Sequence, residues 1–133
     1  MDTRPSFADL LALYRSLLLE DIVPFWEPHL DREYGGILNC LDDAGTLVSE
    51  DKYIWSQARA LYIYAKLCNA IDPRPEWLEA ARSIYRFLLA HGRDRAGHWV
   101  WRTDRRGHTL EGYQSLYAEG FALYGLAEYY RAT

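Results

Sequence analysis

The sequence has few of the features that mark several common classes of protein. Its 133 residues include only two cysteines, Cys40 and Cys68, which form no CxxC pair, so we expect reduced thiols and no disulfide framework. The net charge is −4 and no more than two basic residues are adjacent, which gives no electrostatic reason to expect nucleic acid or an anionic membrane as a partner. No apolar run reaches the roughly 18 residues of a membrane span, and the N-terminal segment does not have the pattern of a signal peptide. These absences predict a cytoplasmic protein.

Aromatic residues, by contrast, are abundant. They make up 15% of the chain, with 11 tyrosines and 5 tryptophans, and 50% of all residues are hydrophobic. Tyrosine and tryptophan pack in cores and also line pockets, because each joins an apolar body to a polar tip. The length fits one domain with a core and a possible pocket.

Hydrophobic periodicity predicts an all-α protein whose helices are joined by short hairpin-like loops. Ser6 and Asp9 form a capping-box pattern at the first helix, and Pro24 is expected to kink or end that helix. Pro75 suits the first turn of the third helix and Gly92 its C-cap. The four expected helices cover residues 6–23, 51–70, 72–92 and 114–132.

The two halves of the chain resemble each other at an offset of 62 residues. Among the identities at this offset are Gly35 with Gly97, Asp42 with Asp104, Gly45 with Gly107, and Ala60-Leu61-Tyr62 with Ala122-Leu123-Tyr124. A fixed period of this kind indicates a repeat architecture, here two helix–loop–helix units at about 1–70 and 71–133. The last helix ends in apolar and aromatic residues, which predicts that the chain is the N-terminal part of a longer array or needs a partner surface. Six such units would be about 370 residues, enough to close a ring of helical hairpins.

An aromatic stripe with polar ends lies along the second helix of each unit. Trp55, Arg59, Tyr62 and Lys66 follow helical spacing, and the offset maps them onto Tyr117, Phe121, Tyr124 and Glu128. If the second helices stand side by side, the stripes form one surface. Such aromatic faces suit the C–H faces of a sugar ring, and Gln57 and Glu119 are expected nearby to hydrogen-bond hydroxyl groups.

Arg59 is the exception in this stripe, because its counterpart is Phe121. A guanidinium in a semi-enclosed aromatic cavity loses solvation unless it is paired. It could bind an oxygen of a ligand, form an ion pair with a carboxylate such as Glu119, or lie extended on the surface.

The remaining polar motifs favour structural roles. The four histidines fall at loops or helix ends without the i, i+4 spacing of metal ligands, so neither a metal site nor a catalytic role is expected for them. Asp42 and Asp104 suit turns. The charged run at residues 102–106 is expected to be a solvated turn. An αα-barrel glycosidase would need a catalytic carboxylate pair, and the sequence offers no convincing one.

Three segments carry a resemblance to a known family. The stretches "FWEPHLDREYGGILNCLDDAG" and "DKYIWSQARALYIYAKL" resemble the N-terminal third of the N-acylglucosamine 2-epimerase family, and "SLYAEGFALYGLAEYYRAT" resembles its fourth helix. The spacing of Lys52, Tyr53, Trp55, Gln57 and Arg59 is more similar to the N-acylglucosamine epimerase branch than to the cellobiose epimerase or mannose isomerase branches.

The resemblance implies an (α/α)6 barrel, of which this chain would be the first four helices, and epimerisation or isomerisation at C2 of a sugar without a cofactor. Proton abstraction at C2 would give an enediolate, with Arg59 as the catalytic cation beside the developing oxyanion. The substrate would contact Tyr53, Trp55, Gln57, Glu119 and Phe121. The family's catalytic histidines lie on later helices, so this chain alone is expected to have negligible activity. The alternative is a non-catalytic αα-repeat module that binds a sugar or a protein partner through its aromatic face. A stable homodimer would favour this alternative.

Overall fold

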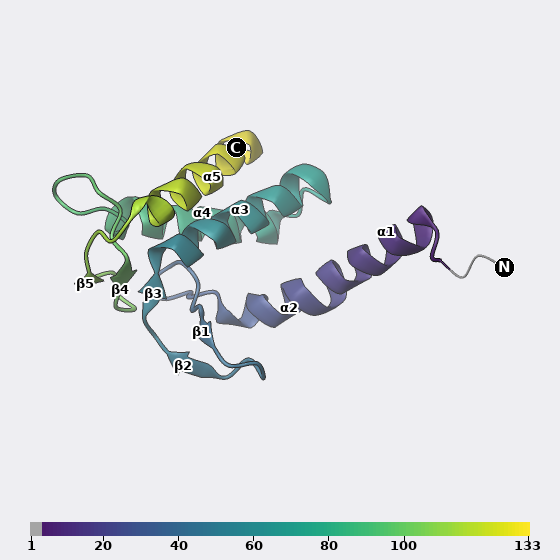
Figure 1. The fold of residues 1–133 in the computed structure, drawn as a ribbon, viewed down its shortest axis with the longest axis horizontal. Helices are drawn as coiled ribbons and strands as arrows, with labels where there is room; N and C mark the ends of the chain where they lie inside the picture. The colour runs from purple at the N-terminus through teal and green to yellow at the C-terminus, as the bar shows by residue number, and fades with distance from the viewer. Residues whose placement is uncertain (1–3) are drawn as a thin grey trace.

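The computed structural model describes residues 4–133. The chain starts with a long helical rod that runs away from the rest of the molecule (Figure 1). The rod consists of α1 (Phe7–Ser16), a π-helical segment η1 (Leu17–Ile22), α2 (Val23–Trp26) and a 3-10 turn η2 (Glu27–His29). Ser6 is the N-cap and forms the predicted capping box with Asp9. The α-helix ends at Trp26, near Pro24 as predicted, and a π-helical segment precedes the proline. A wider turn fits there because proline lacks the N–H that a regular helix needs.

Three further helices form the body of the molecule. They are α3 (Ile54–Ala70), α4 (Pro75–His91) and α5 (Leu116–Ala132). Pro75 occupies the first turn of α4 and Gly92 is its C-cap, as predicted. The described chain is therefore rich in helix with a few short strands, as the sequence predicted in outline.

The loops between the helices form two small antiparallel sheets. The first pairs β1 (Cys40–Leu41) with β2 (Leu47–Ser49). The second joins β3 (Lys52–Tyr53), β4 (Arg102–Thr103) and β5 (Thr109–Glu111) in that order. The pairing of β3 with β4 joins the first half of the chain to the second. Because Lys52 and Tyr53 belong to β3, α3 begins at Ile54 instead of the predicted Asp51.

The same turn closes both hairpins. Asp42 accepts backbone hydrogen bonds from Ala44 and Thr46, and Asp104 accepts one from His108. Gly45 and Gly107 have φ of +82° and +98°, a conformation that favours glycine. The predicted turn roles of Asp42 and Asp104 are confirmed.

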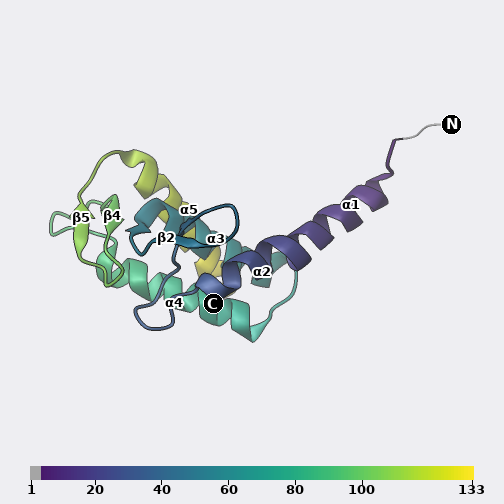
Figure 2. The same cartoon turned by 90° about the horizontal axis from the view of Figure 1, so that it is seen from below.

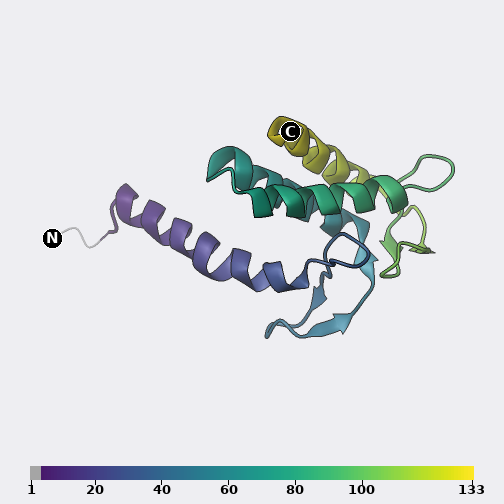
Figure 3. The ribbon, with the colours of Figure 1, turned by 180° about the vertical axis from the view of Figure 1, so that it is seen from behind.

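The core lies where α3 packs against α4 and α5 (Figures 1 and 3). Ile54, Ala58 and Leu61 of α3 are completely buried, and α4 contributes Trp77, Ile84 and Phe87. The rod joins this core through Val23, whereas its first half projects beyond the other helices (Figure 2). No helix in residues 4–133 is long and apolar enough to cross a membrane.

Helices α3 and α5 lie side by side and run in the same direction, in register with the 62-residue offset. Tyr62 stacks on Tyr124, with ring centroids 3.8 Å apart and an interplanar angle of 18°. Near their C-terminal ends, Nζ of Lys66 lies 3.7 Å from a carboxylate oxygen of Glu128. Residues at equal positions in the two halves therefore contact each other, which meets the condition under which the two stripes form one surface.

Candidate functional site

An aromatic cluster gathers where the N-terminal ends of α3 and α5 meet the three-stranded sheet. Trp55 is at its centre: its ring lies 5.7 Å from Tyr117, 6.3 Å from Phe121 and 6.5 Å from Trp101, measured between centroids. Tyr53 lies 6.4 Å from both tryptophans. The rings come from both halves of the chain, so the β3–β4 pairing and the α3–α5 contact together bring them into one cluster. We call Tyr53, Trp55, Trp101, Tyr117 and Phe121 the aromatic cluster.

Arg59 lies at the edge of this cluster. Its guanidinium carbon is 5.4 Å from the centroid of Phe121 and 5.8 Å from that of Trp55, within the range of a cation–π contact. The side chain is exposed, and across residues 4–133 no carboxylate lies within ion-pair distance of it, so the ion pair with Glu119 considered from the sequence is not formed. Arg59 thus combines an aromatic support with free donors.

Gln57 points away from solvent. It is fully buried, its Oε1 accepts a hydrogen bond from the backbone N–H of Ile37 at 2.8 Å, and its Nε2 donates to the Ile37 carbonyl oxygen and to Asn39. The amide is therefore occupied in holding the first loop against α3. Binding of a hydroxyl group by Gln57 stays a prediction.

Glu119 and Phe121 lie on α5 with different surroundings. Phe121 is half-buried between Trp55 and Tyr117, 4.9 Å from the latter. Glu119 is half-buried in the first turn of α5, where the helix dipole favours a negative charge. Of the site residues expected from the sequence, the structure brings together Tyr53, Trp55, Arg59 and Phe121.

A buried ionic cluster joins the first loop, at Asp31 and Gly35, to the second loop, at Arg105. Nζ of Lys52 donates to Asp31 at 2.8 Å and to the carbonyl oxygens of Gly35 and Arg105, and both charged side chains of the Lys52–Asp31 pair are completely buried. Arg105 donates two further hydrogen bonds to the same carboxylate. Burial would raise the pKa of Asp31, but the hydrogen bonds from Arg105 and Lys52 outweigh it and hold that pKa well below its usual range. Burial lowers the pKa of Lys52, and the Asp31 bond opposes that shift.

The predicted turn is present at residues 104–107, but the prediction that its charges are solvated is wrong for Arg102 and Arg105. Arg105 binds the buried Asp31, and Arg102 bridges Asp51 and Glu111. Sequence patterns missed these pairs because their members are between 9 and 74 residues apart. The same holds for Trp101, whose place in the aromatic cluster depends on the pairing of β3 with β4.

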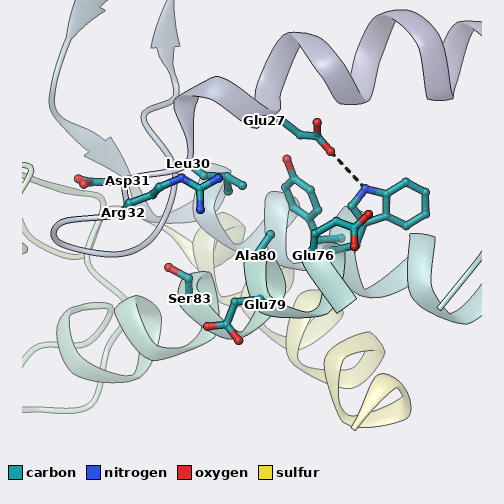
Figure 4. A pocket seen from close by; sticks show the side chains of 10 residues that line it. Glu27, Leu30, Asp31, Arg32, Glu76, Glu79, Ala80 and Ser83 are labelled. Carbon is teal, nitrogen blue, oxygen red and sulfur yellow. Dashed lines mark hydrogen bonds between the residues drawn. The ribbon is translucent and has the colours of Figure 1, made fainter. Parts of the chain in front are cut away.

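A second concave region lies between η2 and α4. It is a cleft of about 500 Å³, lined by Glu27, Glu76, Glu79 and Trp77 among others, with the hydroxyl of Tyr64 buried behind it (Figure 4). Glu27 accepts a hydrogen bond from the Trp77 indole at 3.3 Å. No group of three or more metal-ligating side chains occurs in the described part of the chain. The cleft and the aromatic cluster have no lining residue in common.

Comparison with known proteins agrees with the motifs. The sequence profile of the family described as N-acylglucosamine 2-epimerase matches residues 35–133. The chain belongs to this family. It is 31% identical to a cellobiose 2-epimerase of Dictyoglomus turgidum over 84% of this chain and 29% of that one, and 30% identical to an N-acylglucosamine 2-epimerase of Bos taurus over 86% and 28%. The solved structure of a cellobiose 2-epimerase from Spirochaeta thermophila superimposes with a TM-score of 0.89 at 28% identity, covering 100% of this chain and 33% of that one.

This member of the N-acylglucosamine 2-epimerase family spans about 30% of the length of those curated relatives. The near-equal identities of 31% and 30% do not separate the cellobiose from the N-acylglucosamine branch. The branch suggested by the spacing of Lys52 to Arg59 stays a prediction.

Proposed function

We propose that the aromatic cluster and Arg59 form one wall of the sugar pocket of a C2 epimerase or isomerase. The observation that carries the proposal is Arg59, an exposed cation supported by Trp55 and Phe121 without a carboxylate partner. The Nε1–H of Trp55 is buried and has no hydrogen-bond acceptor within the described residues. Family membership supplies the reaction class.

In this proposal residues 1–133 are the N-terminal portion of one (α/α)6-barrel domain, with repeats at about 1–70 and 71–133. The rod, α3, α4 and α5 are its first four helices, and α3 and α5 face the central cavity. Tyr53, Trp55, Gln57, Glu119 and Phe121 are the proposed substrate-binding residues.

Arg59 is the proposed catalytic cation. When a base removes the C2 proton of the open-chain sugar, negative charge develops on the oxygen at C1, and a guanidinium beside that oxygen stabilises the enediolate. Return of the proton to the other face of C2 gives the epimer, whereas return to C1, together with transfer of the O2 proton to the oxygen at C1, gives the ketose. Within residues 4–133 none of the histidines belongs to the aromatic cluster, so the proposal assigns proton transfer to groups outside this chain.

Sugar binding tests the proposal directly. In ¹H–¹⁵N NMR titrations with N-acetylglucosamine and with cellobiose, we expect the indole signal of Trp55 to shift at millimolar sugar. Arg59→Ala should weaken binding at least tenfold, because a hydrogen bond to a charged group contributes about 1.5–3 kcal/mol. Its matched control is Arg82→Ala, since Arg82 lies on α4 and pairs with Glu79. If neither sugar moves the Trp55 signal, or if both variants bind like the wild type, the proposal is wrong.

A non-catalytic binding module is the second candidate, and the absence of a histidine from the aromatic cluster favours it. Exchange of the C2 proton of N-acetylmannosamine with deuterium from the solvent separates the two. The chain alone is expected to show no exchange above background. Exchange that disappears in Arg59→Ala would show that the described residues suffice for catalysis.

A further inference from the structure

The cleft between η2 and α4 is a concave site of its own, apart from the aromatic cluster. Its volume of about 500 Å³ lies within the range of small-molecule sites. One wall is formed by η2 and the loop that follows it, and the other by the first half of α4 (Figure 4). Leu30, Trp77 and Ala80 give the cleft an apolar part, and Tyr64 of α3 also lines it.

Acidic side chains dominate the polar part of this cleft. Its charged lining residues are Glu27, Asp31, Glu76, Glu79 and Arg32. The ionic cluster described above neutralises Asp31, and Arg82 pairs with Glu79. Glu27 and Glu76, which come from opposite walls, have no cationic partner within residues 4–133. Arg74, whose guanidinium lies over the Trp77 ring, pairs with Asp72 instead. The cleft therefore offers unpaired negative charge to a cation.

The hydroxyl of Tyr64 is a buried polar group that lacks a partner. Tyr64 is 4% exposed and lines the cleft, yet its oxygen forms no hydrogen bond with any part of the chain that the structure describes. Burial, and then the negative charge of Glu27, raise the pKa of Tyr64 well above its usual range, so the phenol stays protonated. A buried hydroxyl without a hydrogen bond is unfavourable, and a ligand that donates to its oxygen relieves that cost.

We propose that this cleft binds a small primary amine, with its ammonium group held between Glu27 and Tyr64. An ammonium group has three hydrogens and no lone pair, so it needs acceptors only. Oε1 of Glu27 accepts the Trp77 indole N–H at 3.3 Å, which leaves Oε2 for the amine. The Tyr64 oxygen is the second acceptor, and the Glu76 carboxylate adds negative charge from the opposite wall.

The lining favours an alkylammonium ion over other cations. A divalent metal ion takes several oxygen ligands, and the described residues contain no group of three or more metal-ligating side chains. Trp77 and Ala80 are buried apolar residues that suit an alkyl chain. Arg32 lies beside Leu30, at the opposite end of the cleft from Glu76, where it would repel a second ammonium group (Figure 4). A short monoamine therefore fits the cleft better than a diamine.

A titration with n-butylamine at pH 7 and constant ionic strength tests the proposal. We expect the indole ¹H–¹⁵N signal of Trp77 to shift and saturate at millimolar amine, because that N–H donates to Glu27. Tetramethylammonium has the charge without an N–H, and 1-butanol has the chain without the charge, so neither should move the signal. An equal shift with tetramethylammonium, or no shift with n-butylamine, overturns the proposal. Sugar binding is followed at Trp55 instead, so the two proposals fail independently.

Two isosteric substitutions test which groups hold the amine. Glu27→Gln keeps an acceptor for the Trp77 indole but removes the charge, and Tyr64→Phe removes only the hydroxyl. Each should weaken binding of n-butylamine at least tenfold. Tyr64→Phe should not lower Tm, since the lost hydroxyl has no partner in the described chain. The matched control is Glu20→Gln, an exposed residue of η1 outside the cleft, which should bind like the wild type. Wild-type affinity in either cleft variant, or a lower Tm of Tyr64→Phe, overturns the proposal.

Discussion

At the scale of single residues, the most constrained side chain is Lys52. Its ammonium group is completely buried, and three acceptors, the Asp31 carboxylate and the carbonyl oxygens of Gly35 and Arg105, satisfy its three hydrogens. A charge removed from water is tolerated only with such complete pairing, and removal of one partner leaves the other charge unpaired. Lys52 and Asp31 are therefore a structural pair that holds the loop at Gly35 and the loop at Arg105 together.

Lys52→Met should reduce the free energy of unfolding by about 3–5 kcal/mol, because it leaves Asp31 buried with one cation fewer. Lys66→Met is the matched control. Lys66 is 42% exposed and pairs with Glu128 at 3.7 Å, so its loss should cost at most about 1 kcal/mol. Urea unfolding followed by circular dichroism measures both. Equal losses in the two variants would contradict the structural role of the buried pair.

The lowered pKa of Asp31 predicts how stability depends on pH. The unfolded carboxyl titrates near pH 4, and the folded one titrates well below that. The ionised carboxylate therefore stabilises the fold above about pH 4, and this contribution is lost as the pH falls below 4 toward the folded pKa. The difference in unfolding free energy between wild type and Asp31→Asn should shrink between pH 6 and pH 2. A difference that stays constant over this range would show that Asp31 does not titrate as described.

At the scale of the elements, the close approach of α3 to α5 depends on one glycine, Gly125. Gly125 lies against the backbone of Ala58, whereas Gly120, five residues earlier on the same helix, faces open space. The close packing of the two helices therefore requires a glycine at position 125 but not at position 120, although both residues lie within α5.

Gly125→Ala should destabilise the chain by about 1–3 kcal/mol, because the new Cβ forces α5 away from Ala58. Gly120→Ala should stabilise it by about 0.5–1 kcal/mol, because alanine restricts the unfolded chain and clashes with nothing. Thermal unfolding at low protein concentration measures both changes. The same sign for the two substitutions would show that the close contact at Gly125 is not limiting.

The helices were predictable from sequence because their signals are local. The capping box at Ser6, the proline at residue 75 and the stripe from Trp55 to Lys66 all lie within a few turns of the features that they predict. The 62-residue offset matched the residues of α3 with those of α5, but the sequence analysis only assumed that the two helices lie side by side, and the structure supplies that placement. The ionic cluster around Asp31, the buried position of Gln57 and the inclusion of Trp101 were not predictable, because each depends on a contact across at least 18 residues.

At the scale of the whole molecule, the two halves are tied together at more than one level. β3 of the first half pairs with β4 of the second, and Lys52 and Asp31 of the first bind Arg105 of the second. The α3–α5 contact adds the stacked tyrosines. Neither half keeps its loops or its aromatic cluster without the other.

The chain should therefore unfold in one transition. Far-UV circular dichroism reports on the helices of both halves, whereas tryptophan fluorescence reports on the packing around the five tryptophans, Trp26, Trp55, Trp77, Trp99 and Trp101. The urea midpoints from circular dichroism and from tryptophan fluorescence should coincide, because a cooperative unit loses both signals together. Arg105→Ala should lower both midpoints equally. Separated midpoints would mean that the halves fold independently.

The register of α3 and α5 also governs how the two halves of the sequence can diverge. Where equal positions touch, one substitution in an ancestral single unit would have appeared on both sides of the contact at once. Two tyrosines can stack on each other, so positions 62 and 124 stay compatible when both hold the same residue. Two lysines repel each other, so positions 66 and 128 attract each other only after the side chain at one of them has changed the sign of its charge. Duplication thus preserves likeness at the stacking positions and demands asymmetry at the charged ones.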